Sequence, residues 1–152
     1  MPRMPAEMYL AAVKQSRWHE KRRHVIGLIN WRLASGSVFH PDDILSACRQ
    51  SVSIKFVRAT IEMVMDEGMA VKISGNRYGP SPKHVHGRRS MYLNLFSAKS
   101  HISPKEVFHS LPVPESRNDV RIMIAELEQL GYIEKVQRGV YRKASQSEKI
   151  AV

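Results

Sequence analysis

The sequence repeats itself at an offset of 63 positions. Residues 38–80 align with residues 101–143 without a gap, and eight of the aligned pairs are identical where composition alone gives about two or three. The identical pairs are Pro41/Pro104, Ser53/Ser116, Val57/Val120, Arg58/Arg121, Ile61/Ile124, Gly68/Gly131, Lys72/Lys135 and Tyr78/Tyr141. Helical periodicity alone does not place a proline, a glycine, a lysine and a tyrosine in register. The repeat therefore predicts two copies of one small unit, each of about 55–60 residues.

The second copy predicts the order of elements within a unit. The boundaries of its elements are marked by local signals: apolar spacing, a Ser-Pro-x-Glu helix start, two later prolines, a serine N-cap, a glycine stop and an Arg-Gly turn. The expected order is a helix, a short strand, two helices and a hairpin: Arg88–Lys99, Ile102, Ser103–Leu111, Ser116–Leu130, and Tyr132–Gln137 with Val140–Lys143.

The first copy follows the same order. Its expected elements are a helix at His19–Ala34, a strand at Val38–Phe39, helices at His40–Leu45 and Ser53–Glu67, and a hairpin at Met69–Ser74 and Arg77–Gly79. The predicted division is an apolar and basic extension (1–18), a first domain (19–79), a basic linker (80–87), a second domain (88–143) and a disordered tail (144–152).

Each copy resembles a winged helix–turn–helix module, and the stretch Ser116–Ile133 resembles the recognition helices of small bacterial regulators. The resemblance covers almost the whole chain and indicates the superfamily but no single family within it. It implies a mainly α fold with small β-hairpins (α+β), arranged as two tandem winged helix–turn–helix domains from an internal duplication. Chains with such a pair are similar to bacterial, phage and plasmid DNA-binding regulators.

The charge of the chain points in the same direction. Its 24 lysines and arginines exceed its 14 acids by ten, and the pI is near 10. From Gly68 to Lys105 there is no acidic residue. Such a chain favours polyanions, above all nucleic acid and to a lesser degree an anionic membrane surface.

A helix–turn–helix reads the major groove with the first turns of its last helix. The candidate site residues are therefore the polar residues in the first turns of the third helix of each copy. Arginine pairs with guanine and asparagine with adenine through two hydrogen bonds each, whereas serine at a helix start donates to phosphate. The candidate DNA-binding residues are Ser53, Lys55 and Arg58 in the first copy and Ser116, Arg117, Asn118 and Arg121 in the second. An exposed face of solvated charges is the alternative interpretation.

The hairpins and the linker supply a second set of candidates. Arg77 and Arg138 lie at the two hairpin turns, where a side chain reaches the minor groove or phosphates, and Lys83, Arg88 and Arg89 lie in or beside the linker. Ordinary solubilising turns and a solvated spacer remain alternatives.

Several classes are excluded or disfavoured. There is one cysteine, Cys48, so neither an internal disulfide nor a cysteine-based zinc site is possible, and Cys48 is expected to play a buried apolar role. His84, His86 and His101 make a poor metal site because two of them fall in the linker. No enzyme signature, cofactor motif or membrane-spanning run is present, so we expect a cytoplasmic, nucleoid-associated protein that is not an enzyme.

The sequence therefore predicts a sequence-specific binder of double-stranded DNA, most simply a transcriptional regulator. One alternative is a protein–protein adaptor that uses an exposed Phe56 and the apolar segment 1–18, which is also a candidate contact for a homodimer or a protein partner. A second alternative is a plasmid or phage replication initiator, which shares the DNA-binding chemistry.

Overall fold

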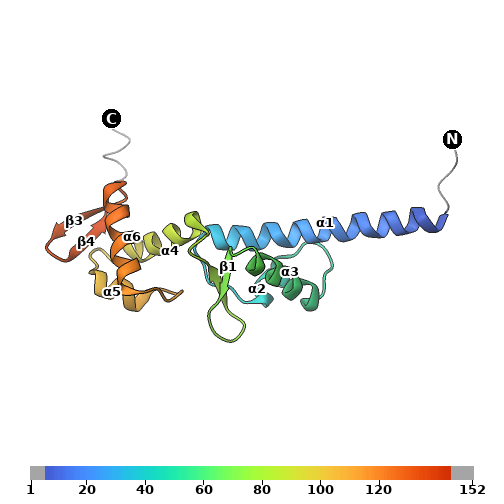
Figure 1. The fold of residues 1–152 in the computed structure, drawn as a ribbon, viewed down its shortest axis with the longest axis horizontal. Helices are drawn as coiled ribbons and strands as arrows, with labels where there is room; N and C mark the ends of the chain where they lie inside the picture. Colours follow the sequence, from blue (N-terminus) through green and yellow to red (C-terminus); the bar gives the residue numbers. More distant parts are fainter. Residues whose placement is uncertain (1–5, 145–152) are drawn as a thin grey trace.

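The computed structural model describes residues 6–144, and within them the chain is mainly helical with two small antiparallel hairpins (Figure 1). The expected fold class, mainly α with small β-hairpins, is confirmed. The elements are α1 (Ala6–Ala34), α2 (Pro41–Ala47), α3 (Ile54–Asp66), β1 (Ala70–Lys72), β2 (Tyr78–Pro80), α4 (Val85–Ala98), α5 (Pro104–Ser110), α6 (Arg117–Gln129), β3 (Ile133–Gln137) and β4 (Val140–Lys143).

The two halves of the chain, residues 6–80 and 85–144, have the same order of elements. In the first half Phe39 pairs with Tyr78 as a one-residue third strand, and in the second half Ile102 pairs with Tyr141 in the same way. The second bridge is displaced from the first by the repeat offset of 63 residues at both partners, and both bridges carry backbone hydrogen bonds of 2.8–2.9 Å. The short strands expected before the second helix of each unit are therefore present.

Each half has its own apolar core, formed where the amphipathic helices meet. In the first half the core joins α1, α2, α3 and the hairpin, with Ile29, Phe39 and Ile61 almost fully buried. In the second half it joins α4, α5, α6 and the hairpin, with Tyr92, Ile102 and Ile124 at the equivalent positions.

The halves are joined where the end of α1 meets the start of α4, and glycine makes this close contact possible. A Cβ atom on Gly87 would lie 2.1 Å from the carbonyl oxygen of Leu33, and one on Gly36 would lie 2.4 Å from the backbone nitrogen of Met91. The side-chain amide of Asn94 donates to the carbonyl of Ser35 at 3.0 Å and adds a polar contact. The two helices therefore pack backbone against backbone.

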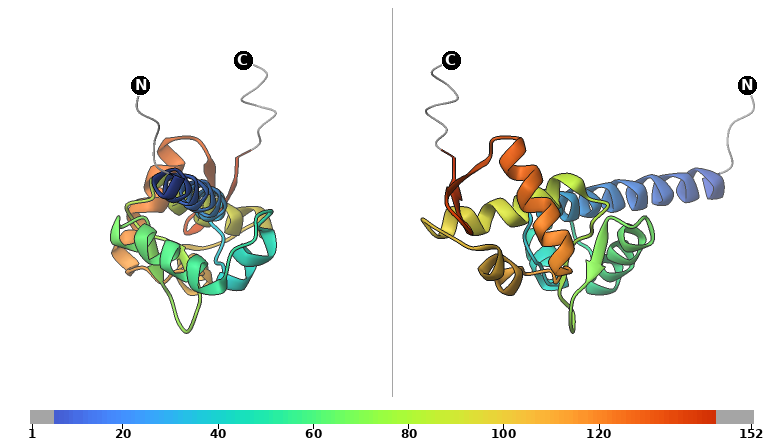
Figure 2. Two further views of the ribbon diagram at one scale, coloured as in Figure 1. Left: turned by 90° about the vertical axis from the view of Figure 1, so that its right-hand side faces the viewer. Right: turned by 60° about the vertical axis from the view of Figure 1, so that its left-hand side comes forward.

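The first hairpin forms a second contact between the halves. Its turn projects beyond the helices in every view (Figure 2), but its strands pack against the segment that connects α5 to α6. Val71 and Ile73 contact the core of the second half, and a Cβ on Gly79 would lie 2.6 Å from Val113. The first hairpin is thus shared by both halves.

Helix α1 is longer than expected. It begins at Ala6 rather than His19 and runs for 29 residues, about 43 Å, beyond the rest of the first half (Figure 1). Its extra turns bring Trp18 into edge contact with Phe56, with ring centroids 6.2 Å apart. Phe56 is therefore half-buried, so the expectation of an exposed Phe56 is wrong. The sequence did not predict the earlier start, because the turns before His19 have no equivalent in the second copy.

The expected linker is also structured. Residues 80–87 were expected to be an extended spacer, but Pro80 ends β2, Ser81 is buried, and α4 begins at Val85 rather than Arg88. The Ser81 hydroxyl donates to the carbonyl of Gly68. Gly87 packs closely against the backbone of Leu33, a contact that the charges and prolines of this segment do not reveal. The expected tail lies outside the described residues except for Ala144.

We predict that Gly87→Ala destabilises the protein although alanine is the better helix former. The new methyl group meets a backbone carbonyl that cannot move aside, and overpacking of this kind costs about 1–3 kcal/mol. Gly27 is the matched control, because it lies inside α1 with no atom within 4 Å of its missing Cβ. Gly27→Ala should raise the free energy of unfolding by about 0.5–1 kcal/mol in urea denaturation. Equal stabilisation by both changes would show that the contact between α1 and α4 is loose.

Candidate nucleic-acid interface

Helices α3 and α6 are built alike at both ends. Ser53 and Ser116 cap their starts, and each hydroxyl oxygen accepts the backbone N–H three residues on at 3.1 Å. Gly68 and Gly131 follow their ends with φ of 81° and 82°, a left-handed conformation that favours glycine and closes the last turn. The two serines are thus engaged as caps, and only their hydroxyl protons remain to donate.

The buried and exposed faces of these helices separate apolar from polar residues as predicted. Val57, Ile61 and Val64 of α3 are buried, as are their repeat partners Val120, Ile124 and Leu127 of α6. The candidate DNA-binding residues on these helices and at their N-caps are all exposed: Ser53, Lys55, Arg58, Ser116, Arg117, Asn118 and Arg121. In Figure 1 both helices begin on the lower side of the molecule, where the turn between β1 and β2 also lies.

Most of the acidic residues of α3 and α6 lie toward the C-terminal ends of these helices. On α3 the acids are Glu62 and Asp66, and on α6 the later turns carry Glu126 and Glu128. The early turns carry Lys55 and Arg58 on α3, and Arg117 and Arg121 with one acid, Asp119, on α6. Helix dipoles add positive potential at the same ends. The early turns of both helices therefore form the cationic ends that a polyanion would meet.

Arg121 and Asn118 form a pair on the surface of α6. A guanidinium nitrogen of Arg121 donates to the Asn118 side-chain oxygen at 2.7 Å. This bond uses one of the five donors of arginine and holds the side chain across the exposed face. Its repeat partner Arg58 has no hydrogen bond or ion pair within residues 6–144 and extends freely from α3.

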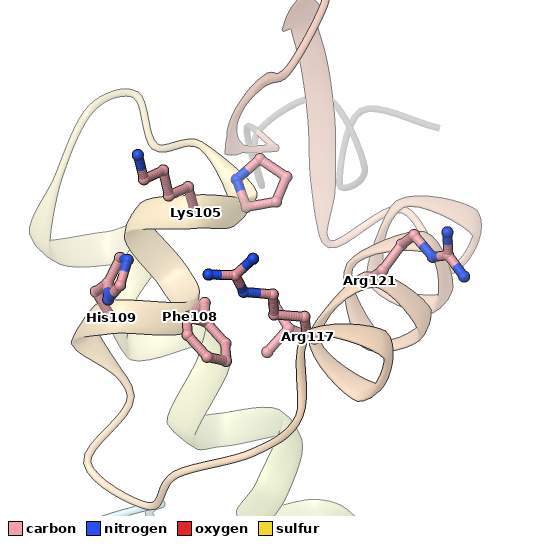
Figure 3. A pocket seen from close by; sticks show the side chains of 7 residues that line it. Lys105, Phe108, His109, Arg117 and Arg121 are labelled. Atoms are coloured by element: carbon pink, nitrogen blue, oxygen red, sulfur yellow. The ribbon is translucent and has the colours of Figure 1, made fainter.

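A groove lies between α5 and α6 in the second half. It has a volume of about 510 Å³ and is lined by Pro104, Lys105, Phe108, His109, Arg117, Val120 and Arg121. Figure 3 shows the guanidinium of Arg117 between the two helices, with Lys105 and His109 on the α5 side and Arg121 directed away. The Arg117 guanidinium carbon lies 5.3 Å from the centre of the Phe108 ring. Arg117 thus points into this groove, at an angle to Arg121.

Basic residues of α1 that were not among the candidates adjoin the start of α3. Lys14, Arg17 and Lys21 line a second hollow of about 410 Å³ together with Trp18, Phe56 and residues 51–53. Their spacings of three and four residues place them on one face of the helix. This spacing is visible in the sequence, but the expected helix start at His19 left Lys14 and Arg17 outside the helix. The structure thus joins a basic stripe of α1 to the first candidate helix.

Arg22 belongs to the packing between α1 and α3. Its guanidinium carbon lies 4.6 Å from the centre of the Trp18 ring and 4.4 Å from that of Phe56. One of its nitrogens donates to the hydroxyl of the buried Thr60 at 2.8 Å. Such a cation between two aromatic rings orients α1 on α3.

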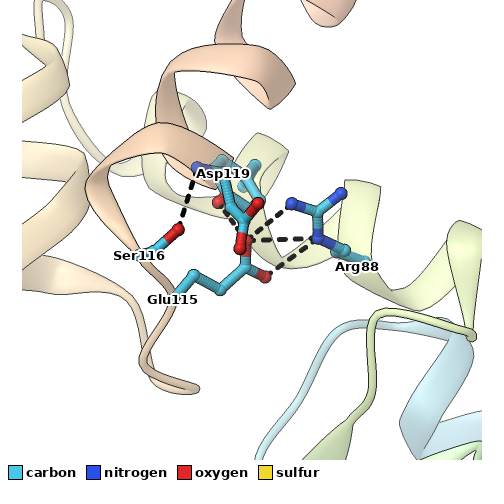
Figure 4. Close-up of polar contacts among 5 residues, drawn as sticks. Arg88, Glu115, Ser116 and Asp119 are labelled. Atoms are coloured by element: carbon cyan, nitrogen blue, oxygen red, sulfur yellow. Dashed lines mark hydrogen bonds and ion pairs between the residues drawn. The ribbon is translucent and has the colours of Figure 1, made fainter.

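Arg88 and Arg89 have structural partners, which differs from the DNA-contacting role expected for them. Arg88 donates to both carboxylate oxygens of Glu115, the closest contact being 2.7 Å, and the Tyr92 hydroxyl donates to Glu115 at 2.6 Å (Figure 4). The side chains of Arg88 and Glu115 are only 17% and 6% exposed. Arg89 pairs with Glu126 at 2.6 Å. We leave both arginines out of the proposed interface for this reason.

This network shifts proton equilibria. The hydrogen bond from Arg88 to Glu115 raises the pKa of the guanidinium, although partial burial opposes the change. Burial, followed by the bond to Glu115, raises the pKa of the Tyr92 phenol far above its usual range. Both shifts favour the protonated form of the two donors, which hold Glu115 and the segment before α6 against α4.

The remaining candidates lie apart from the early turns of α3 and α6. Arg77 and Arg138 are exposed in the turns of the two hairpins, which project to different sides of the molecule (Figure 1). Lys83 runs over Gly68, so that its ammonium group lies beside the C-terminal end of α3. That position favours a cation through the helix dipole.

Other chemistry is sparse in the part of the chain that the structure describes. No group of three or more histidine, cysteine or acidic side chains is placed to hold a metal ion there. His84 accepts the Gly87 backbone N–H at 3.0 Å as the cap of α4, a role the sequence did not suggest. Cys48 is half-buried, and burial raises the pKa of its thiol. No helix among the described residues has the length and apolar character to cross a bilayer.

We predict that Arg88→Ala lowers the free energy of unfolding by about 2–3 kcal/mol, because it leaves Glu115 buried without its partner. The control is Arg142→Ala on β4, which breaks an exposed ion pair with Glu134 and should cost less than about 1 kcal/mol. Chemical denaturation of the two variants compares the pairs directly. A destabilisation as small as that of the control would show that Arg88 is a surface charge.

Known proteins give little to compare. No family model matches the chain, and no curated protein matches it. Among solved structures, the mRNA-binding domain of elongation factor SelB from E. coli in complex with SECIS RNA is similar at 12% identity, covering 83% of this chain and 98% of that chain. Its TM-score is 0.34, which is too low to carry an argument.

Proposed function

We propose that the chain is a sequence-specific double-stranded DNA-binding protein, a transcriptional regulator that reads major grooves with α3 and α6. In this proposal each half is a winged helix–turn–helix module, and the pair arose by duplication. The observation that carries the proposal is that Arg58 and Arg121, identical in the repeat, are both exposed on the cationic early turns of α3 and α6.

The chemistry of the exposed residues suits base edges. Arg58 and Arg121 present several N–H donors each, which match the two acceptors that guanine shows in the major groove. Asn118 keeps its amide donors and a further lone pair while it accepts from Arg121, so it remains able to pair with adenine. Lys55 supplies charge without directional preference, which suits phosphate contact.

The basic stripe of α1 extends the proposed surface. Lys14, Arg17 and Lys21 adjoin the start of α3, where a helix inserted in a groove brings the phosphate backbone close. Charges in this place raise affinity for any sequence and steer association. The hairpin turns with Arg77 and Arg138 are further contacts in this proposal, and Lys83 at the far end of α3 is a weaker one.

The contact between the halves supports reading by both helices together. Backbone packing at Gly87 and the first hairpin against Val113 hold α3 and α6 in one relative orientation. A rigid pair of reading helices requires a fixed spacing between its two subsites. A single asymmetric site is therefore expected for one chain, and an inverted repeat would indicate a dimer.

The adaptor hypothesis loses part of its support, because α1 covers Phe56. What remains for a partner or a second copy is the projecting part of α1, on which Met8 is 60% exposed. A replication initiator would use the same DNA chemistry and differ only in the site bound.

Selection from random duplex oligonucleotides at physiological salt tests the proposal. Enrichment of a defined sequence is expected, and enrichment of none would end the claim of specificity. Within the selected site, Arg121→Ala should lower affinity about 5- to 150-fold and relax the preference at one base position. Arg142→Ala removes the same charge from a neutralised pair on β4 and should change affinity less than about threefold.

A second prediction concerns the basic stripe of α1. The double variant Lys14→Ala with Arg17→Ala should weaken binding to specific and random duplexes alike, because both charges meet phosphate rather than bases. The slope of log affinity against log salt should become shallower by about 0.9 for each phosphate that is no longer neutralised. An unchanged slope in a salt titration would place the stripe outside the interface.

A further inference from the structure

The groove between α5 and α6 combines an apolar floor with a cationic rim. Its volume of about 510 Å³ is within the usual range for small-molecule sites and far exceeds the size of a water or a simple ion. Pro104, Phe108 and Val120 supply the apolar surface. Lys105, His109 and Arg117 supply nitrogen donors, whereas the side chain of Arg121 lines the edge and is directed away (Figure 3). No carboxylate lines the groove.

The cations of this groove are not neutralised by the protein. Within residues 6–144 no ion pair includes Lys105, Arg117 or Arg121. Of the three acids nearest in the chain, Glu106 pairs with Lys99 at 3.0 Å and Glu115 pairs with Arg88, and the third, Asp119, does not line the groove. Unpaired cations beside an apolar floor select a ligand that carries negative charge.

The aromatic ring adds a requirement of shape. Phe108 is half-buried, with the guanidinium of Arg117 over its face and the His109 ring in edge contact at 5.2 Å (Figure 3). A guanidinium is flat and delocalised, and here it occupies the place that a stacked planar ring would take. The ligand that fits this site is a flat ring with an attached anionic group.

The first half shows that the fold does not require these residues. The repeat partners of Lys105, Phe108, His109 and Arg117 are Asp42, Leu45, Ser46 and Ile54. Leu45 is enough to pack the equivalent helix, and an acid stands where the second half has a lysine. The aromatic ring and three of the four nitrogen-bearing side chains are therefore specific to the second half.

We propose that the groove between α5 and α6 binds an unpaired nucleotide, whose base takes the place of the Arg117 guanidinium on the face of Phe108 and whose phosphate is held by the displaced Arg117 and by Lys105. The nucleotide is either free or part of a single strand, and in the second case the proposal rests on the proposed function of nucleic-acid binding. Arg121, which is directed away from the groove, stays available for a duplex.

The test uses the full chain and follows the Phe108 and His109 ring signals by NMR during titration. The probes are nucleoside 5′-monophosphates, inorganic phosphate and a short single-stranded oligonucleotide, all at one ionic strength. A monophosphate should bind at least about tenfold more tightly than inorganic phosphate because of base stacking. Binding of the monophosphate indicates a free nucleotide as ligand, and binding of the oligonucleotide alone indicates a strand. Equal affinity for phosphate, or no shift of either ring with any probe, would overturn the proposal.

Two variants separate this site from the duplex interface. Phe108→Leu copies the residue that packs the first half, so the fold should persist while nucleotide affinity falls about tenfold and duplex affinity is retained. Arg58→Ala should do the reverse. Unchanged nucleotide affinity in Phe108→Leu would overturn the proposal. Absence of duplex binding with nucleotide binding intact would overturn only the proposed function.

Discussion

The close contact between the backbones of α1 and α4 is the constraint on which the rest of the structure depends. A carbonyl of Leu33 lies where any side chain on residue 87 would have to begin, so the two helices approach nearer than side chains ordinarily allow. Because each helix is the first element of its own core, this contact sets the orientation of both halves. The first hairpin, pressed against Val113, adds a second point of attachment. Two points of attachment on separate elements resist rotation as well as separation.

This rigid connection gives the charge of the chain a defined arrangement. The cationic early turns of α3 and α6 are held apart at one spacing, and α1 brings a basic stripe alongside the first of them. Two arginines that contribute to the net charge, Arg88 and Arg89, instead form ion pairs that fix the start of α4 against α6 and its preceding segment. Net charge therefore overstates the surface available to a polyanion, and position within the fold decides which cations can serve.

The halves share a pattern of elements but differ in the chemistry of their surfaces. The first half has the basic stripe and an arginine packed between Trp18 and Phe56, because α1 is long enough to cover α3. The second half lacks that cover, and its groove between α5 and α6 is open and lined by Phe108 and unpaired cations. The two halves thus share the exposed arginines Arg58 and Arg121, and each half also has a surface that the other lacks.

Local signals in the sequence determined the order of elements, the serine caps, the glycine stops, the one-residue strands and the exposure of the candidate side chains on α3 and α6. These features depend on residues a few positions apart, so periodicity and capping chemistry are sufficient to predict them. Tertiary structure alone decided the extent of α1, the burial of Phe56, the pairing of Arg88 with Glu115 and the groove at Phe108. Each of these depends on groups from separate elements meeting in space, and a charge or an aromatic ring in a sequence does not reveal which partner will reach it.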